Sequence, residues 1–81
     1  MYTMITRHDC KYCDKSKKML DQEGIPYVVY NIENRASKWV LTLMKAAGIK
    51  TVPQTFSTDG NLVGGFRELE TLMGTLSEKE Y

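Results

Sequence analysis

The chain carries both of its cysteines and its single histidine in one short stretch near the N-terminus, Arg7 to Cys13. Cys10 and Cys13 are separated by two residues, a β-prone run ends just before them, and a helical pattern begins with them. Cysteines at this spacing can form a disulfide if they straddle a strand-to-helix turn, and the helix N-terminus stabilises a thiolate. The stretch therefore predicts a reversible two-electron redox pair where a strand meets a helix.

The composition favours one globular domain over residues 1–81. The chain is 42% hydrophobic, and 11 basic residues against 10 acidic ones give a net charge of +1. So small a charge does not favour nucleic acid or an anionic membrane as a partner. No signal peptide is evident, no run approaches the roughly 20 apolar residues of a membrane span, and two cysteines are too few for a secreted disulfide scaffold. We expect a soluble, monomeric protein of a reducing compartment.

The hydrophobic periodicity predicts the order strand, helix, strand, helix, strand, strand, helix. The expected strands lie at 2–6, 27–30, 55–57 and 62–63, and the expected helices lie at about 11–23, about 36–47 and from residue 66 onward. The initial strand, helix and strand imply a right-handed parallel crossover, whereas Asp59-Gly60 between two β-prone runs predicts an antiparallel hairpin. The sequence thus predicts an α/β protein with a mixed four-stranded sheet covered by helices on both faces.

Apolar stripes at helical spacing predict which helix faces are buried. In the first helix the expected positions are Cys13, Ser16 or Lys17, Met19 and Leu20. In the second they are Ala36, Val40, Leu43, Met44 and Ala47, and in the last they are Phe66, Leu69, Leu72, Met73 and Leu76. The tail over 77–81 is polar and is expected to fray.

Three motifs in register resemble those of the glutaredoxins. Cys10-Lys11-Tyr12-Cys13 is similar to the family's Cys-Pro-Tyr-Cys, Thr51-Val52-Pro53-Gln54 to its cis-proline loop, and Asn61-Leu62-Val63-Gly64-Gly65-Phe66 to its glycine pair. The resemblance covers nearly the whole chain. The short length of the chain and its Gly-Gly-Phe run look most like those of bacteriophage glutaredoxins. The resemblance implies a thioredoxin fold with strand order 2-1-3-4 and thiol-disulfide oxidoreductase activity. It also implies a cytoplasmic location, which for a bacteriophage protein is the cytoplasm of the host.

The resemblance also implies roles for the residues of the first two motifs. Cys10 would be the exposed nucleophile that attacks a substrate disulfide, and Cys13, shielded behind it, would resolve the mixed disulfide. Val52 would offer its backbone to an extended substrate or to glutathione. Pro53, expected in cis, would place that backbone beside the sulfur, and Thr51 belongs to the same loop.

Basic residues around the cysteines resemble groups that support the thiolate or bind glutathione. Lys11 stands where the family usually has proline and adds a positive charge beside Cys10, and Lys17 matches a lysine that can support the thiolate. A solvated lysine without a role explains either position as well. Arg7 matches the basic residue that holds a glutathione carboxylate, a task that suits arginine. Tyr12 either shapes the groove beside the active site or has a purely structural role.

The start of the last helix resembles the family only in part. Gly64 and Gly65 have a structural explanation in backbone freedom, and the helix N-terminus beyond them suits the γ-glutamyl carboxylate of glutathione. Glutaredoxins usually carry a small hydroxyl or thiol residue and then an aspartate that binds the α-amino group. Here Arg67 replaces the small residue, and Glu68 could replace the aspartate. The Gly-Phe-Arg run is similar to that of redoxins reduced by thioredoxin reductase that serve ribonucleotide reductase.

The sequence therefore favours a dithiol glutaredoxin that reduces protein disulfides and glutathione mixed disulfides, with glutathione as reductant. Ribonucleotide reductase is the protein substrate that the family implies. A first alternative keeps the chemistry but uses thioredoxin reductase as electron donor. An alternative of another class is a noncatalytic carrier of a metal or an iron–sulfur cluster on the same cysteines. A zinc site needs four ligands and only His8 could supply a third, so no bound metal is expected.

Overall fold

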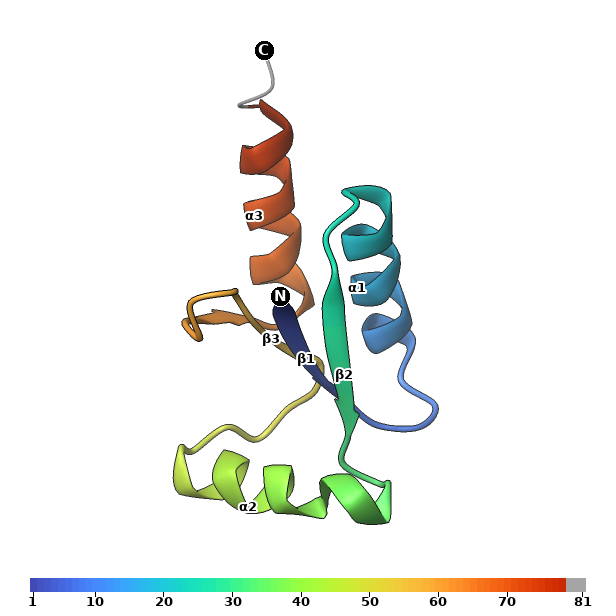
Figure 1. Ribbon diagram of the computed structural model, residues 1–81, viewed down its shortest axis with the longest axis vertical. Helices are drawn as coiled ribbons and strands as arrows, with labels where there is room; N and C mark the ends of the chain where they lie inside the picture. The colour runs from blue at the N-terminus through green and yellow to red at the C-terminus, as the bar shows by residue number, and fades with distance from the viewer. Residues whose placement is uncertain (79–81) are drawn as a thin grey trace.

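Four strands form one mixed sheet that carries three α-helices, as the computed structural model describes for residues 1–78 (Figure 1). The strands are β1 (Tyr2–Thr6), β2 (Tyr27–Asn31), β3 (Gln54–Phe56) and β4 (Leu62–Gly64). The helices are α1 (Lys11–Gln22), α2 (Lys38–Ala46) and α3 (Phe66–Glu78), and a 3₁₀ turn at Arg35–Ser37 precedes α2. The element order and the strand order β2-β1-β3-β4 confirm the predicted topology.

The central strand β1 joins the parallel and antiparallel halves of the sheet. It pairs in parallel with β2, with Tyr2 opposite Tyr27, and antiparallel with β3, which in turn pairs antiparallel with β4. The parallel pairing follows from the α1 crossover, and the β3–β4 hairpin follows from the predicted Asp-Gly turn. Because the chain reaches the cysteines just after β1, the redox pair lies beyond the buried end of the central strand.

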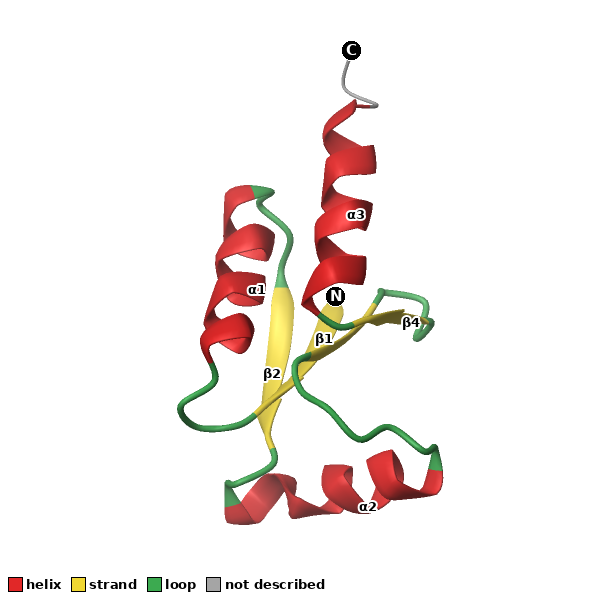
Figure 2. Cartoon of the chain, turned by 180° about the vertical axis from the view of Figure 1, so that it is seen from behind, coloured by secondary structure: helices red, strands yellow, loops and turns green. Residues whose placement is uncertain are grey.

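Successive residues of β1 point to opposite faces of the sheet and contribute to two separate hydrophobic clusters. Met4 packs with Leu20 of α1 and with Leu69 and Met73 of α3, whereas the next residue, Ile5, packs on the opposite face. In Figure 1 and, from behind, in Figure 2, α1 and α3 run side by side, and α2 runs crosswise to them, packed against Ile5 on the other face of the sheet. The cysteine-bearing helix is thus held by a core that includes α3.

The predicted apolar stripe of α2 is wrong at three of its five positions. Val40 and Met44 are buried against Ile5, but Ala36, Leu43 and Ala47 are exposed, Leu43 to 58%. The stripe assumed one continuous helix, whereas Ala36 lies in the 3₁₀ turn and α2 is only nine residues long. So short a helix contacts the sheet through a single row of residues four apart.

Other boundaries differ by a few residues from those expected. Gly64 belongs to β4 rather than breaking the strand, and β3 begins at Gln54. α3 continues through Glu78, so the fraying expected from residue 77 does not begin there. The predicted burial of the Leu76 side chain and the expected tail over 79–81 lie outside the described residues. Over residues 1–78, no helix combines the length and apolar character needed to cross a bilayer.

Candidate active site

Cys10 and Cys13 form a disulfide at the N-terminus of α1. Their Cα atoms are 5.2 Å apart, a separation typical of disulfides. Cys10 is the N-cap residue of the helix, with an extended backbone, and its Sγ accepts a hydrogen bond of 3.2 Å from the N–H of Cys13. When the disulfide is reduced, a thiolate at Cys10 lies where helix N–H groups and the helix dipole stabilise negative charge.

The two cysteines differ in their access to solvent. Cys10 is 8% exposed and Cys13 is 1% exposed. The expectation of an exposed nucleophile therefore holds only relative to Cys13, because most of the Cys10 surface is also covered in the disulfide form. Cys13 is covered because it begins the buried row of α1 that continues through Ser16 and Leu20. An approaching molecule thus reaches Cys10 more readily than Cys13.

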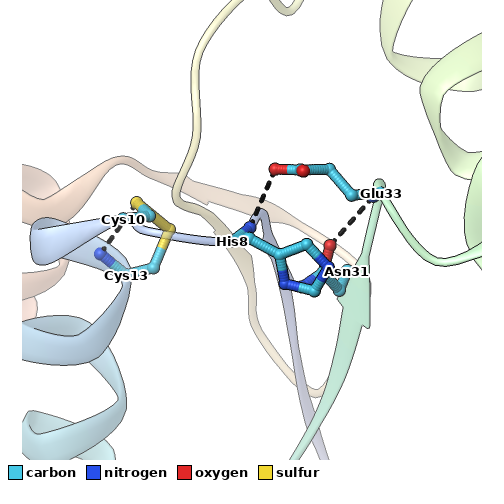
Figure 3. Close-up of a disulfide and its surroundings, with 5 residues drawn as sticks. All are labelled: His8, Cys10, Cys13, Asn31 and Glu33. Atoms are coloured by element: carbon cyan, nitrogen blue, oxygen red, sulfur yellow. Dashed lines mark hydrogen bonds between the residues drawn. A yellow bond between two sulfur atoms is a disulfide. The ribbon is translucent and has the colours of Figure 1, made fainter.

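The loop that leads to Cys10 is tethered to the end of β2. The His8 N–H donates to Glu33 Oε1 at 2.9 Å, and the Glu33 N–H donates to Asn31 Oδ1 at 2.9 Å (Figure 3). Because Asn31 Oδ1 already accepts, the Asn31 Nδ2 group faces His8 Nδ1 at 3.2 Å, and this ring nitrogen acts as the acceptor. These bonds fix the turn in which Asp9 adopts a positive φ of 50° directly before Cys10.

The Val52–Pro53 peptide bond is cis, as predicted. Pro53 is buried, and Thr51 Oγ1 accepts a hydrogen bond of 3.1 Å from Gln54 Nε2, which braces the loop. Two surface grooves meet at this loop and share Thr51 and Val52. A molecule that paired with the backbone of Val52 would therefore extend into either groove.

The first groove, which we call the tyrosine groove, has a volume of about 860 Å³. Besides the cis-proline loop, its lining includes Tyr12, Lys15, Gly65, Phe66, Arg67 and Glu68. The rings of Tyr12 and Phe66 have centroids 5.2 Å apart, and Lys15 Nζ lies 5.2 Å from the first centroid and 5.9 Å from the second. This aromatic pair with a cation on its face joins the active-site helix α1 to the start of α3.

At the start of α3, Glu68 closes a cap on its own helix. The Gly65 N–H donates to Glu68 Oε1 at 2.9 Å, which is the glutamate half of a capping box. Gly64 has φ +123°, and a Cβ there would lie 2.9 Å from Cβ, Cγ and Oε1 of Glu68. Gly64 is thus required both by its backbone conformation and by the close approach of Glu68. A Cβ on Gly65 would lie 3.6 Å from the Pro53 carbonyl oxygen, so this end of α3 lies against the cis-proline loop.

The second groove, which we call the arginine groove, has a volume of about 590 Å³. Its cationic lining residues are Arg7, Lys45 and Lys50, and its apolar ones include Ile32, Leu41, Met44 and Ile49. No acidic residue is among its lining residues. Its charge is therefore of one sign, whereas the tyrosine groove contains both Lys15 and Arg67 and the acids Glu68 and Glu70.

The predicted site residues fall into distinct groups. The structure brings Tyr12, Thr51, Val52, Pro53, Gly65 and Glu68 together in the tyrosine groove and places Arg7 in the arginine groove with Thr51 and Val52. Lys11 and Lys17 lie on α1 and line neither groove. Gly64 also lines neither groove, but it lies directly beside Glu68.

Sequence reasoning missed three lysines that line the grooves: Lys15, Lys45 and Lys50. A signal existed for Lys15, because it follows Tyr12 by three positions on a predicted helix and so shares its face. No local signal linked Lys45 and Lys50 to Arg7. Among residues 1–78, no group of three His, Cys, Asp or Glu side chains is arranged to hold a metal ion.

Comparisons with known proteins agree with this geometry. The Glutaredoxin family model matches residues 1–63. Glutaredoxin 3 of Escherichia coli K12 is 33% identical over 83% of this chain and 78% of its own length, and the glutaredoxin of Enterobacteria phage T4 is 31% identical over 76% and 82%.

Solved structures show the same fold. Glutaredoxin 1 from Francisella tularensis, crystallised with cacodylate, has a TM-score of 0.75 at 25% identity and 95% coverage of both chains. NrdH-redoxin from Escherichia coli has a TM-score of 0.76 at 23% identity, covering 93% of this chain and 92% of its own, which bears on the fold alone. The four-stranded sheet is that of the thioredoxin fold.

Proposed function

Since the chain belongs to the glutaredoxin family and is a thiol-disulfide oxidoreductase with its redox pair at Cys10 and Cys13, we propose that glutathione is its electron donor. The observation that carries this proposal is that one cationic side chain and one carboxylate lie on opposite sides of Val52–Pro53. Arg7 lies in one groove and Glu68 in the other. Glutathione has a carboxylate at its glycine end and an ammonium group at its γ-glutamyl end, so an extended molecule across Val52 would meet both charges.

In the proposed cycle, the Cys10 thiolate attacks a sulfur of the substrate disulfide and forms a mixed disulfide, and the departing thiolate takes up a proton. The Cys13 thiolate then attacks the Cys10 sulfur, which releases the second substrate thiol and leaves the Cys10–Cys13 disulfide. One glutathione thiolate reopens this bond by forming a mixed disulfide at Cys10. A second glutathione attacks that mixed disulfide, which yields oxidised glutathione and restores both thiols.

The assignment of Cys10 as the attacking sulfur is supported by its place on the helix. It caps α1, it accepts the Cys13 N–H, and it is the more exposed of the two cysteines. We further propose that the positive charges of Lys11 and Lys17 support the thiolate, because Lys11 directly follows Cys10 and Lys17 lies about two turns further along α1. Tyr12, which is 52% exposed, would shape the wall against which the substrate packs.

The start of α3 supports binding of the γ-glutamyl end. Glu68 Oε1 is occupied by the Gly65 N–H, which leaves the second carboxylate oxygen to accept from the α-ammonium group. The first N–H groups of α3, beyond Gly64 and Gly65, suit the α-carboxylate. The backbone of Val52, held by the loop from Thr51 to Pro53, would pair with the peptide of glutathione.

One observation favours the alternative of thioredoxin reductase as the electron donor. Arg67, which has no counterpart among the small residues usual in the family, lines the tyrosine groove beside Glu68. A long side chain there would limit the space for a small thiol, whereas a protein partner could contact the side chain itself. With either donor, we propose disulfide-containing proteins as substrates, ribonucleotide reductase among them by family inference, in the reducing cytoplasm where thiols are maintained.

Turnover with two electron donors tests the proposal. The oxidised protein is mixed with NADPH and either glutathione plus glutathione reductase or thioredoxin reductase, and NADPH oxidation is followed with a disulfide substrate present. We expect turnover in the glutathione system and little in the other. Rapid turnover with thioredoxin reductase alone would overturn the choice of glutathione. Visible absorption by the purified protein would instead favour the cluster-carrier alternative, because a bound iron–sulfur cluster is coloured.

A further inference from the structure

The arginine groove presents more positive charge than a single glutathione carboxylate would use, and we propose that it binds an acidic segment of the protein disulfide substrate. The proposal rests on the proposed function, because the segment is one that flanks the cysteine attacked by Cys10. The groove begins at Thr51 and Val52, the residues that it shares with the tyrosine groove. A substrate chain that pairs with the Val52 backbone is therefore led into it.

The cationic side chains of this groove have no partner among the residues that the structure describes. Arg7, Lys45 and Lys50 are exposed, and none of their side chains makes a hydrogen bond or an ion pair in the part of the chain that the structure describes. No acidic residue lines the groove. Three like charges around one concave surface repel each other, and an anion bound among them relieves that repulsion. The complementary ligand thus carries negative charge.

The base of the arginine groove is apolar, so a well-fitting ligand also needs an apolar group. Met44 is 4% exposed at its base, and Ile32, Leu41 and Ile49 are partly buried around it. Burying an aliphatic side chain on such a surface is favourable in proportion to the apolar area removed from water. A segment with at least one aliphatic side chain next to acidic ones fits this lining better than a free inorganic anion does.

A set of synthetic peptides tests the proposal. Each contains one cysteine joined in a mixed disulfide to 2-nitro-5-thiobenzoate, whose release is followed by absorbance. Leucine and two aspartates flank the cysteine in the first peptide, and two asparagines or two lysines replace the aspartates in the others. The full-length protein is reduced and freed of reductant beforehand, and second-order rate constants are measured at low ionic strength. This single-turnover design does not depend on the electron donor.

We expect the acidic peptide to react about threefold to tenfold faster than the asparagine peptide, and the lysine peptide to be slowest. Lys45→Glu and Lys50→Glu should each lower the rate with the acidic peptide more than the rate with the asparagine peptide, and so remove most of this preference. Lys38→Glu, an equal charge change on the same helix as Lys45 but outside the groove, should keep the preference. Raising the salt concentration should compress the difference between the peptides.

Two results would overturn the proposal. Equal rates for the acidic and asparagine peptides would show that the groove does not select charge. Equal losses in Lys38→Glu and Lys50→Glu would show that only the overall charge matters. Failure of every peptide to react would be a different result, because it would refute the disulfide-reducing function itself and the docking proposal with it. Lys50 lies outside the helices, so Lys50→Glu does not alter a helix terminus and should fold as the parent protein does.

Discussion

The two grooves beside the cis-proline differ in how their charged groups are held. In the tyrosine groove, Lys15 lies against two aromatic rings and Glu68 accepts a hydrogen bond from Gly65. In the arginine groove, three cations face a concave surface with no acidic neighbour in its lining. Lys15 and Glu68 of the first groove thus have partners within the protein, whereas the cationic side chains of the second have none among the residues that the structure describes. We therefore expect substitutions in the first groove to lower the stability of the protein, and substitutions in the second to lower only its selectivity for substrates.

We expect the largest loss of stability from Gly64→Ala, which disturbs the contact with Glu68 at the tyrosine groove. The new Cβ must tolerate a φ of +123° and would come within 2.9 Å of Glu68, so we expect a loss of about 2 to 3 kcal/mol in the free energy of unfolding. Urea denaturation of the disulfide form measures it. Gly60→Ala is the matched control, because Gly60 has φ +84° with nothing within 4 Å of the new Cβ. Equal losses in the two variants would mean that the approach of Glu68 costs nothing.

A smaller effect is expected from removing the cap with Glu68→Ala. Loss of the bond to the Gly65 N–H should lower the free energy of unfolding by about 1 kcal/mol. If Glu68 also receives the α-ammonium group, the KM for glutathione should rise several-fold. Glu68→Gln separates the two effects, because it keeps a hydrogen-bond acceptor but loses the charge. Glu70→Ala is the control on the same helix, and a KM in Glu68→Gln equal to that of the parent would remove Glu68 from the glutathione site.

The smallest effect on stability is expected in the arginine groove. The Lys50 side chain has no partner among the residues that the structure describes, so Lys50→Ala should change the free energy of unfolding by less than about 0.5 kcal/mol. Thermal or urea denaturation of Lys50→Ala, Glu68→Ala and the parent protein measures the change in each variant. A loss as large as that of the cap variant would mean that Lys50 stabilises the fold, and the contrast between the two grooves would then be lost.

The sequence predicted best those features that local signals determine. The cysteine pair, the cis-proline and the hairpin each follow from residues adjacent in the chain, and the order of elements then allowed few topologies. The cap was also accessible, since Gly65 and Glu68 have the spacing of a capping box. The burial of Leu43 was predicted wrongly because the pattern did not reveal where a 3₁₀ turn gives way to α2.

The arginine groove was beyond the reach of sequence reasoning. Arg7 follows β1, Lys45 lies in the last turn of α2, and Lys50 lies in the loop before the cis-proline. Each looks like an ordinary solvated cation in its local context. Only the fold brings them around one concave surface. Because Arg7 lies 38 positions before Lys45, no periodicity in the sequence links it to the two lysines.

The central claim is that Cys10 is the sulfur that exchanges with the substrate disulfide and with glutathione, whereas Cys13 exchanges only with Cys10, because Cys10 caps α1 and is the more exposed of the two. Cys13→Ser and Cys10→Ser, both reduced, are each incubated with oxidised glutathione, and the modified cysteine is identified and timed by mass spectrometry after rapid acid quenching. The account predicts prompt formation of a glutathione mixed disulfide on Cys10 in Cys13→Ser, and little on Cys13 in Cys10→Ser. Equal rates of modification in the two variants would contradict it.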